Sequence, residues 1–190
     1  VIGLSQLIKK EIISAAKKGV VGFHPAALPK FRGRATLVWQ MLLKVKEPKC
    51  SMFLIDEGTD SGDILAQEPF SIGEEDYAED VMKNLESSIT KMTHELLPKL
   101  MNNTVVPVKQ NDAEATYTLI RRPEDGKINW NDSLDNIHLL LRAVSRPYPG
   151  AFSDYDGEHK FIFWRAERMK NDKYIGIPGQ ICAIGENYIN

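Results

Sequence analysis

The sequence predicts an α/β fold with a mostly parallel sheet and flanking helices. Short apolar segments, such as Val20 to Phe23 and Cys50 to Ile55, alternate with longer segments of helical periodicity. The chain has 190 residues, of which 43% are hydrophobic and 26% charged, and this is the composition of a globular protein. Its length suits one domain of ordinary size, with room for a fragment of a second.

The predicted helices follow from capping residues and from apolar periodicity. Ser5 is expected to cap a first helix, and residues 36–46 form a second. The clearest periodicity follows Asp76, where apolar residues recur at spacings of one, three and four, which indicates a helix packed on the core. A later helix begins at Asp132 or Ser133. The apolar stripe after Asp76 consists of Val81, Met82, Leu85, Ile89, Met92, Leu96 and Leu100.

Charge and cysteine content exclude several classes of protein. The chain carries 24 Lys and Arg against 26 Asp and Glu, so no overall basic charge points to a nucleic-acid partner. Every apolar run is shorter than the ~20 residues that a membrane helix needs. Cys50 and Cys182 do not form a C-x-x-C pair, which argues against a zinc cluster. Two lone thiols are typical of a reducing compartment, so we expect a cytoplasmic protein.

Two predicted loops carry the residues that a catalytic site would need. His24 comes directly after a buried strand and is followed by Pro25 and Pro29, which restrict the backbone. Residues 56–63 form a glycine-rich loop after the next strand, and they include Asp60. Because ligands bind at the carboxyl ends of parallel strands, we expect both loops to open on one edge, with His24 and Asp60 in contact. A neighbouring carboxylate keeps an imidazole charged and oriented near neutral pH.

Structural explanations of these loops stay open at this point. Loops rich in Asp and Gly are common turns, and a histidine before proline often serves the fold alone. The acidic spacing of residues 56–63 does not match a calcium-binding loop. The residue pattern therefore allows a His–Asp site and specifies no reaction.

Two motifs resemble the paired signature of a known enzyme family. Residues 24–33 read HPAALPKFRG and residues 56–64 read DEGTDSGDI. Together they are similar to the 10-formyltetrahydrofolate-dependent formyltransferases, which act on methionyl-tRNA, glycinamide ribonucleotide or nucleotide-linked amino sugars. The similarity continues through residues 110–117, 121–130 and 142–152 and covers nearly the whole chain. It implies a formyltransferase-like fold related to the Rossmann fold.

The same resemblance implies a domain organisation. Residues 1–116 are expected to be part of the catalytic domain, with its leading strands and helices absent. Residues 117–150 are a linker and a helix, and residues 151–190 begin a smaller C-terminal OB-like domain. The first residues read like the end of a buried strand, and the last like the start of another. We therefore expect the chain to be an internal piece of a longer protein.

The family site is an Asn-x-His motif with a distant aspartate. In this sequence the resemblance places the histidine at His24 and the aspartate at Asp60, whereas the asparagine position is Gly22. The asparagine amide would donate a hydrogen bond to the carbonyl oxygen under attack. Either another side chain takes this role, which we favour, or the protein is a slow or altered member of the family.

The resemblance also implies binding residues for the two reactants. The co-substrate is 10-formyltetrahydrofolate, whose pterin ring is expected to bind the backbone of two segments, and no metal ion is implied. These segments are Ser5, Gln6, Leu7 and Ile8, and Asp56, Glu57 and Gly58. The expected substrate-binding residues are Arg32, Gly33 and Arg34. The side chains of Arg32, Arg34, Arg142 and Arg146 suit a phosphate or diphosphate, and the alternative is that they are solvated surface charges.

The implied function is transfer of a formyl group to a primary amine. The acceptor is either a nucleotide-linked amino sugar or the methionyl group of initiator tRNA. The His24 imidazolium would donate to the tetrahedral oxyanion, and Asp60 would help to take the proton that the amine loses. The alternatives are a 10-formyltetrahydrofolate hydrolase, in which water replaces the amine, and a non-catalytic folate-binding relative.

Overall fold

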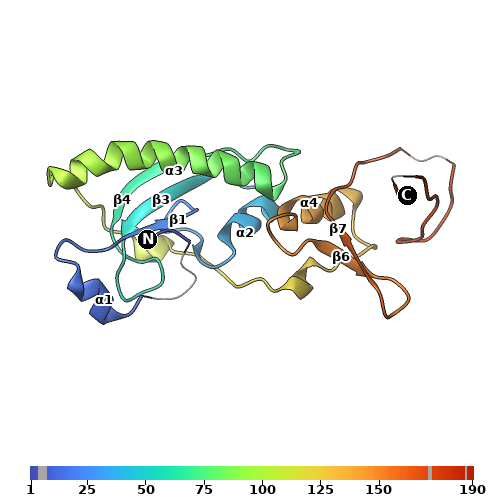
Figure 1. The fold of residues 1–190 in the computed structure, drawn as a ribbon, viewed down its shortest axis with the longest axis horizontal. Helices are drawn as coiled ribbons and strands as arrows, with labels where there is room; N and C mark the ends of the chain where they lie inside the picture. The colour runs from blue at the N-terminus through green and yellow to red at the C-terminus, as the bar shows by residue number, and fades with distance from the viewer. Residues whose placement is uncertain (4–7, 171–172, 187) are drawn as a thin grey trace. The chain divides into compact units, whose positions relative to one another are not determined.

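The computed structural model describes residues 1–190 except 4–7, 171–172 and 187, and the chain divides into two compact units, Val1–Arg121 and Arg122–Asn190 (Figure 1). The elements of the first unit are α1 (Lys10–Ala15), β1 (Val21–His24), β2 (Arg32–Gly33), α2 (Thr36–Leu42), β3 (Lys49–Leu54), β4 (Ile64–Pro69), α3 (Ala78–Met101), a 3-10 turn (Asp112–Glu114) and β5 (Tyr117–Thr118). Those of the second unit are a 3-10 turn (Pro123–Gly126), α4 (Leu134–Val144), β6 (Ala151–Asp154) and β7 (Lys160–Phe163).

The main sheet of the first unit has the strand order β1-β3-β4. Both pairs are antiparallel, with Val21 opposite Leu54 and Lys49 opposite Pro69. The α/β class is confirmed, but the prediction of a mostly parallel sheet is wrong for these strands. Residues 55–63 connect β3 to β4, and such a connection is shorter than the dozen or more residues of a parallel crossover. Among the described strands only β2 and β5 pair in parallel.

Helix α3 packs along the sheet and supplies much of the core (Figure 1). Four residues of the predicted stripe, Val81, Leu85, Met92 and Leu96, are buried, whereas Met82, Ile89 and Leu100 are partly exposed. The helix begins after Tyr77, whose backbone N–H donates to the Asp80 carboxylate at 3.1 Å. Asp76, which the sequence suggested as the start, instead accepts a hydrogen bond from the Gly73 N–H at 2.7 Å.

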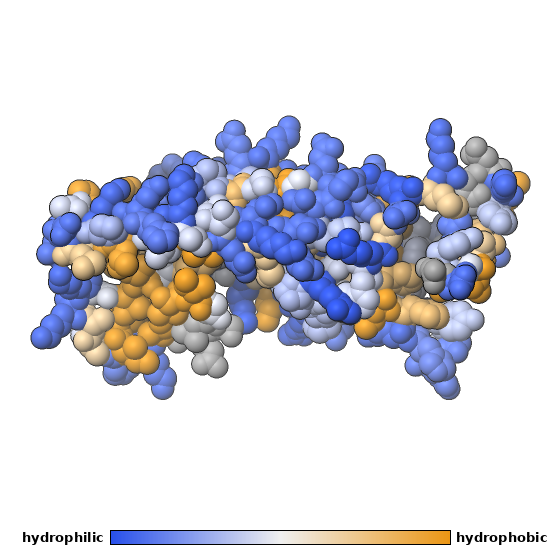
Figure 2. All heavy atoms as spheres, turned by 45° about the horizontal axis from the view of Figure 1, so that its top comes forward, coloured by the Kyte–Doolittle hydropathy of each residue, from blue (hydrophilic) through white to orange (hydrophobic). Residues whose placement is uncertain are grey.

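The first helix differs from the prediction. It is limited to Lys10–Ala15 and buries no residue, and Ile12 on its predicted apolar stripe is 60% exposed. The predicted cap, Ser5, lies outside the described residues. Large apolar side chains are exposed on this unit, and Figure 2 shows them as an orange area at the left of the view.

The second unit contains one described helix and a hairpin. Ser133 caps α4 as predicted, because its side chain accepts a hydrogen bond from the Asn136 N–H at 3.2 Å. Strands β6 and β7 pair antiparallel, with Ala151 opposite Phe163. Among the described residues, no helix has the length and apolar character required to cross a membrane.

Candidate active site

His24 stands at the end of β1 with its ring almost fully buried. Its Nε2 lies 2.7 Å from the backbone oxygen of Phe31, and its Nδ1 lies 3.5 Å from Oδ2 of Asp60. A carbonyl oxygen only accepts hydrogen bonds, so Nε2 carries a hydrogen. Nδ1 is therefore the ring nitrogen that faces the carboxylate, and a doubly protonated ring would donate on both sides.

Asp60 is the more accessible partner of the pair. Its side chain is 23% exposed, against 6% for His24, so a reactant approaches the pair from the carboxylate side. Oδ2 also accepts a hydrogen bond from the Gly33 N–H at 2.8 Å. The carboxylate is thus held by β2 on one side and faces the imidazole on the other.

The two residues meet as predicted, but for a different reason. Since β1 and β3 are antiparallel, their carboxyl ends lie at opposite edges of the sheet and do not bring the two loops together. The loop of residues 55–63 instead carries Asp60 to β2, where it bonds Gly33. The carbonyl of Phe31, the residue before β2, holds His24 from the same segment.

The structure corrects the expected role of Arg32. This side chain is buried, and its guanidinium donates to Gln110, Asp112 and Tyr117 at 2.8–3.1 Å. All three of its nitrogens are engaged by protein groups, which leaves the fork unsuited to a substrate phosphate. Gln110 begins the segment of residues 110–117 that resembles the family, and no local pattern indicates its partners, which lie far away in the sequence.

The remaining predicted arginines differ in their surroundings. Arg34 is exposed next to β2, and its backbone N–H donates to the Thr118 oxygen at 3.0 Å. Arg142 is buried on α4, whereas the Arg146 guanidinium lies 4.8 Å from the centre of the Trp164 ring. Within the first unit, Arg34 is exposed and directly follows Gly33, whose N–H bonds Asp60.

An ion pair joins the turn at Asp56–Gly58, one of the two segments expected to bind folate, to α1. Lys10 Nζ, at the start of α1, lies 2.6 Å from Oε1 of Glu57. The Asp56 side chain accepts from the Gly58 N–H and the Ser61 hydroxyl, which shapes the turn. Ser5, Gln6 and Leu7 lie outside the described residues, whereas Ile8 is half-buried.

Gly22 is the residue that the resemblance assigns to the position of the family asparagine, and apolar side chains lie close to it. A Cβ atom added there would lie 2.8 Å from Cγ1 of Ile55 and 3.0 Å from the Phe53 ring. Neighbouring apolar side chains thus occupy the space that an amide side chain would need.

Restoring the asparagine is therefore expected to weaken the protein. Gly22→Asn should lower the free energy of unfolding by about 1–3 kcal/mol, because overpacking forces Phe53 and Ile55 to move. Denaturant unfolding measures this loss, and adding Ile55→Ala should recover part of it. A stable Gly22→Asn variant with a raised kcat would show instead that the position is open.

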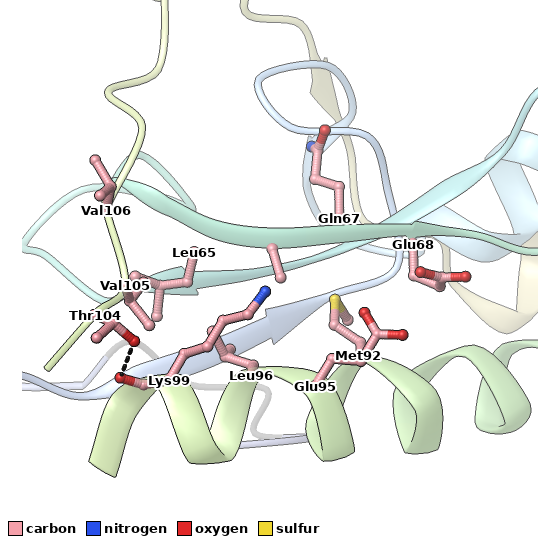
Figure 3. A pocket seen from close by; sticks show the side chains of 11 residues that line it. Leu65, Gln67, Glu68, Met92, Glu95, Leu96, Lys99, Thr104, Val105 and Val106 are labelled. Carbon is pink, nitrogen blue, oxygen red and sulfur yellow. Dashed lines mark hydrogen bonds between the residues drawn. The ribbon is translucent and has the colours of Figure 1, made fainter. Parts of the chain in front are cut away.

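Two hollows of the first unit lie away from the His24–Asp60 pair. One, of about 340 Å³, lies between β4 and the second half of α3, and Figure 3 shows Glu95 and Lys99 at its helical side. The other, of about 180 Å³, is lined mostly by apolar residues of β1 and α3, including Phe23 and Leu97. Neither has His24 or Asp60 in its lining, and among the described residues no His, Cys, Asp and Glu side chains are grouped as a metal site.

Comparisons with known proteins identify the family. The model of the formyl transferase family matches residues 1–101, and that of the formyl transferase C-terminal domain matches residues 121–190. The chain belongs to the formyl transferase family. A methionyl-tRNA formyltransferase from Clostridium thermocellum is 32% identical, with a TM-score of 0.72 over 90% of this chain and 72% of that one.

Two further structures share the fold of this formyl transferase. A 4-N formyltransferase from Francisella tularensis is 21% identical, with a TM-score of 0.74 over 90% of this chain and 70% of that one. HypX from Aquifex aeolicus, in complex with tetrahydrofolic acid, is 19% identical, with a TM-score of 0.82. That match covers 99% of this chain but 32% of HypX. The predicted family, its fold and its class of enzyme, a transferase of formyl groups, are confirmed.

Proposed function

We propose that this protein transfers the formyl group of 10-formyltetrahydrofolate to a primary amine at the His24–Asp60 pair. The observation that carries the proposal is that His24 Nδ1 lies 3.5 Å from Asp60 Oδ2 and that the Asp60 carboxylate is partly open to solvent. The two groups come from segments that are distant in the sequence, and they offer a proton donor beside a proton acceptor.

Asp60 accepts the amine proton and then transfers it to the folate. A neutral amine attacks the formyl carbon, a C–N bond forms, and the amine nitrogen must lose a proton. The partly exposed carboxylate accepts this proton, directly or through water, and returns it to the folate nitrogen as the bond from that nitrogen to the formyl carbon breaks. The proton count therefore balances without a further reactant.

His24 stabilises the charge that develops on the formyl oxygen. Because Nε2 is bonded to the Phe31 carbonyl, the donor available to the oxyanion is a protonated Nδ1. A preorganised donor of this kind contributes ~2.7–4 kcal/mol to stabilisation of the transition state.

Folate binding is supported by the family and by the tetrahydrofolic acid complex of HypX. The chain offers exposed backbone in the turn at Asp56–Gly58, which the Lys10–Glu57 ion pair links to α1. We assign the pterin contacts to this turn together with the segment that ends at Ile8.

Two amines remain as acceptors. The methionyl-tRNA formyltransferase from Clostridium thermocellum, at 32% identity, supports an aminoacyl-tRNA acceptor. The net charge of −2 and the exposed Arg34 beside the pair fit a nucleotide-linked amino sugar. Both free cysteines, Cys50 and Cys182, favour a reducing compartment, and we place the protein in the cytoplasm.

The test is formyl transfer by the complete protein that carries this chain. Incubation with 10-formyltetrahydrofolate should release tetrahydrofolate only when initiator methionyl-tRNA or a nucleotide-linked amino sugar is added. Release with water alone would identify a hydrolase. Folate binding without release under any condition would identify a non-catalytic relative, and either result would overturn the proposal.

A further inference from the structure

We propose that Gln110, clamped by Arg32, is a positioning residue that sets the distance between Asp60 and His24. This inference rests on the proposed function of the pair and adds a second set of residues to it. Gln110 itself does not contact the imidazole or the Asp60 carboxylate, so it acts through the backbone on which Asp60 stands.

The Gln110 amide nitrogen holds the loop of Asp60. Nε2 donates to the backbone oxygen of Asp60 at 2.8 Å and to that of Gly62 at 2.6 Å. These carbonyls lie within three consecutive residues of the loop, so one side chain fixes the backbone on both sides of Ser61. The loop has little other freedom there, because a Cβ at Gly62 would lie 1.7 Å from the Leu54 oxygen.

The Gln110 amide oxygen is held in turn by a buried fork. Arg32 donates to Oε1 through Nε at 3.1 Å and through Nη2 at 2.8 Å. The amide therefore makes four hydrogen bonds, which is its full capacity of two accepted and two donated. Gln110 is 6% exposed and Arg32 is 1% exposed, so water does not compete for these bonds.

Arg32 also lies between the two backbone groups that hold the catalytic pair. The residue before it, Phe31, gives its carbonyl to His24 Nε2, and the residue after it, Gly33, gives its N–H to Asp60 Oδ2. The tripeptide of residues 31–33 thus reaches the pair in two ways. Its backbone bonds the His24 ring and the Asp60 carboxylate, and its Arg32 side chain bonds Gln110, which in turn bonds the Asp60 backbone. A shift of Gln110 would move Asp60 while His24 stays fixed.

Glutamate at position 110 separates the two halves of the clamp. In Gln110→Glu one carboxylate oxygen keeps the bonds to Arg32. The other replaces the amide nitrogen that donates to the backbone oxygens of Asp60 and Gly62, so it repels these two carbonyls and displaces the loop. We expect kcat per folded molecule to fall ~100-fold, as for a displacement of ~1 Å, with a KM for folate changed less than threefold. Arg32→Lys keeps the charge but loses the fork, and a fall of ~10-fold is expected.

A matched control is Gln67→Glu. Gln67 also donates its amide to a backbone carbonyl, that of Leu28 at 3.0 Å, and Figure 3 shows it pointing away from α3. The same chemical change there should leave kcat within twofold of the unchanged protein. Folded fractions are measured by thermal unfolding, so that a loss of folded protein is separated from a loss of turnover.

The side-chain NMR signals of His24 give a readout that does not need turnover. In Gln110→Glu the Nδ1 and Hε1 signals should shift at constant pH, because the carboxylate near Nδ1 has moved, whereas Gln67→Glu should leave them in place. A lowered melting temperature with unchanged His24 signals and unchanged kcat per folded molecule would overturn the proposal. If the unchanged protein releases no tetrahydrofolate, the proposed function fails, yet the NMR comparison still tests the clamp.

Discussion

Replacing His24 by asparagine is expected to lower kcat by ~10³-fold and to leave folate binding nearly unchanged. The His24 imidazole places Nδ1 3.5 Å from Asp60 Oδ2, and its side chain is 6% exposed. Loss of a single oxyanion donor costs ~10²–10³ in kcat, and loss of a proton-transfer group costs a similar factor. Steady-state kinetics with both reactants measure kcat and KM separately.

The partner residue tests whether His24 and Asp60 act as a unit. Asp60→Asn should also lower kcat by ~10²–10³-fold, and the double variant should be little slower than either single one, because groups that act together are not additive. His94→Asn is a matched control, since His94 is exposed on α3 and should leave kcat unchanged. Independent, multiplying losses in the double variant would show that the two residues do not cooperate.

The sequence located His24 and Asp60 because each lies in a motif with its own local pattern. His24 follows a buried strand and precedes proline, and Asp60 lies among glycines. Long apolar periodicity identified α3, and Val81, Leu85, Met92 and Leu96 of the predicted stripe are buried. The helix also buries Ala78 and Ser88, which the stripe did not include. Features that depend on a local pattern were therefore accessible before the structure was known.

Features that depend on residues far apart in the sequence could not be predicted from it. Strand direction depends on the path of the connection between two strands, which the local sequence does not specify. The alternation of strands and helices suggested a parallel sheet, whereas β1, β3 and β4 pair antiparallel. Gln110 lies in a polar loop, and its contacts with Asp60 and Gly62 span 50 and 48 residues. The charge of Arg32 suggested a phosphate ligand, yet its burial makes it part of the clamp.

Replacing Gly33 by alanine is expected to weaken both the fold and the site. Gly33 has φ of +107°, and a Cβ there would lie 2.5 Å from the backbone oxygen of Thr118, its partner in β5. Left-handed strain and the contact with a backbone atom together should lower the free energy of unfolding by about 2–3 kcal/mol. Denaturant unfolding measures this loss.

The same change should reduce turnover, because the Gly33 N–H holds Asp60 Oδ2 at 2.8 Å. If β2 moves away from β5, this bond and the Phe31 carbonyl move together, and kcat per folded molecule should fall ~100-fold. Gly157→Ala separates strain from contact, since Gly157 has φ of +83° and open space around its Cβ. Gly157→Ala should lower the free energy of unfolding by about 1 kcal/mol and keep its kcat. If kcat per folded molecule were the same in Gly33→Ala and Gly157→Ala, β2 would not hold the His24–Asp60 pair.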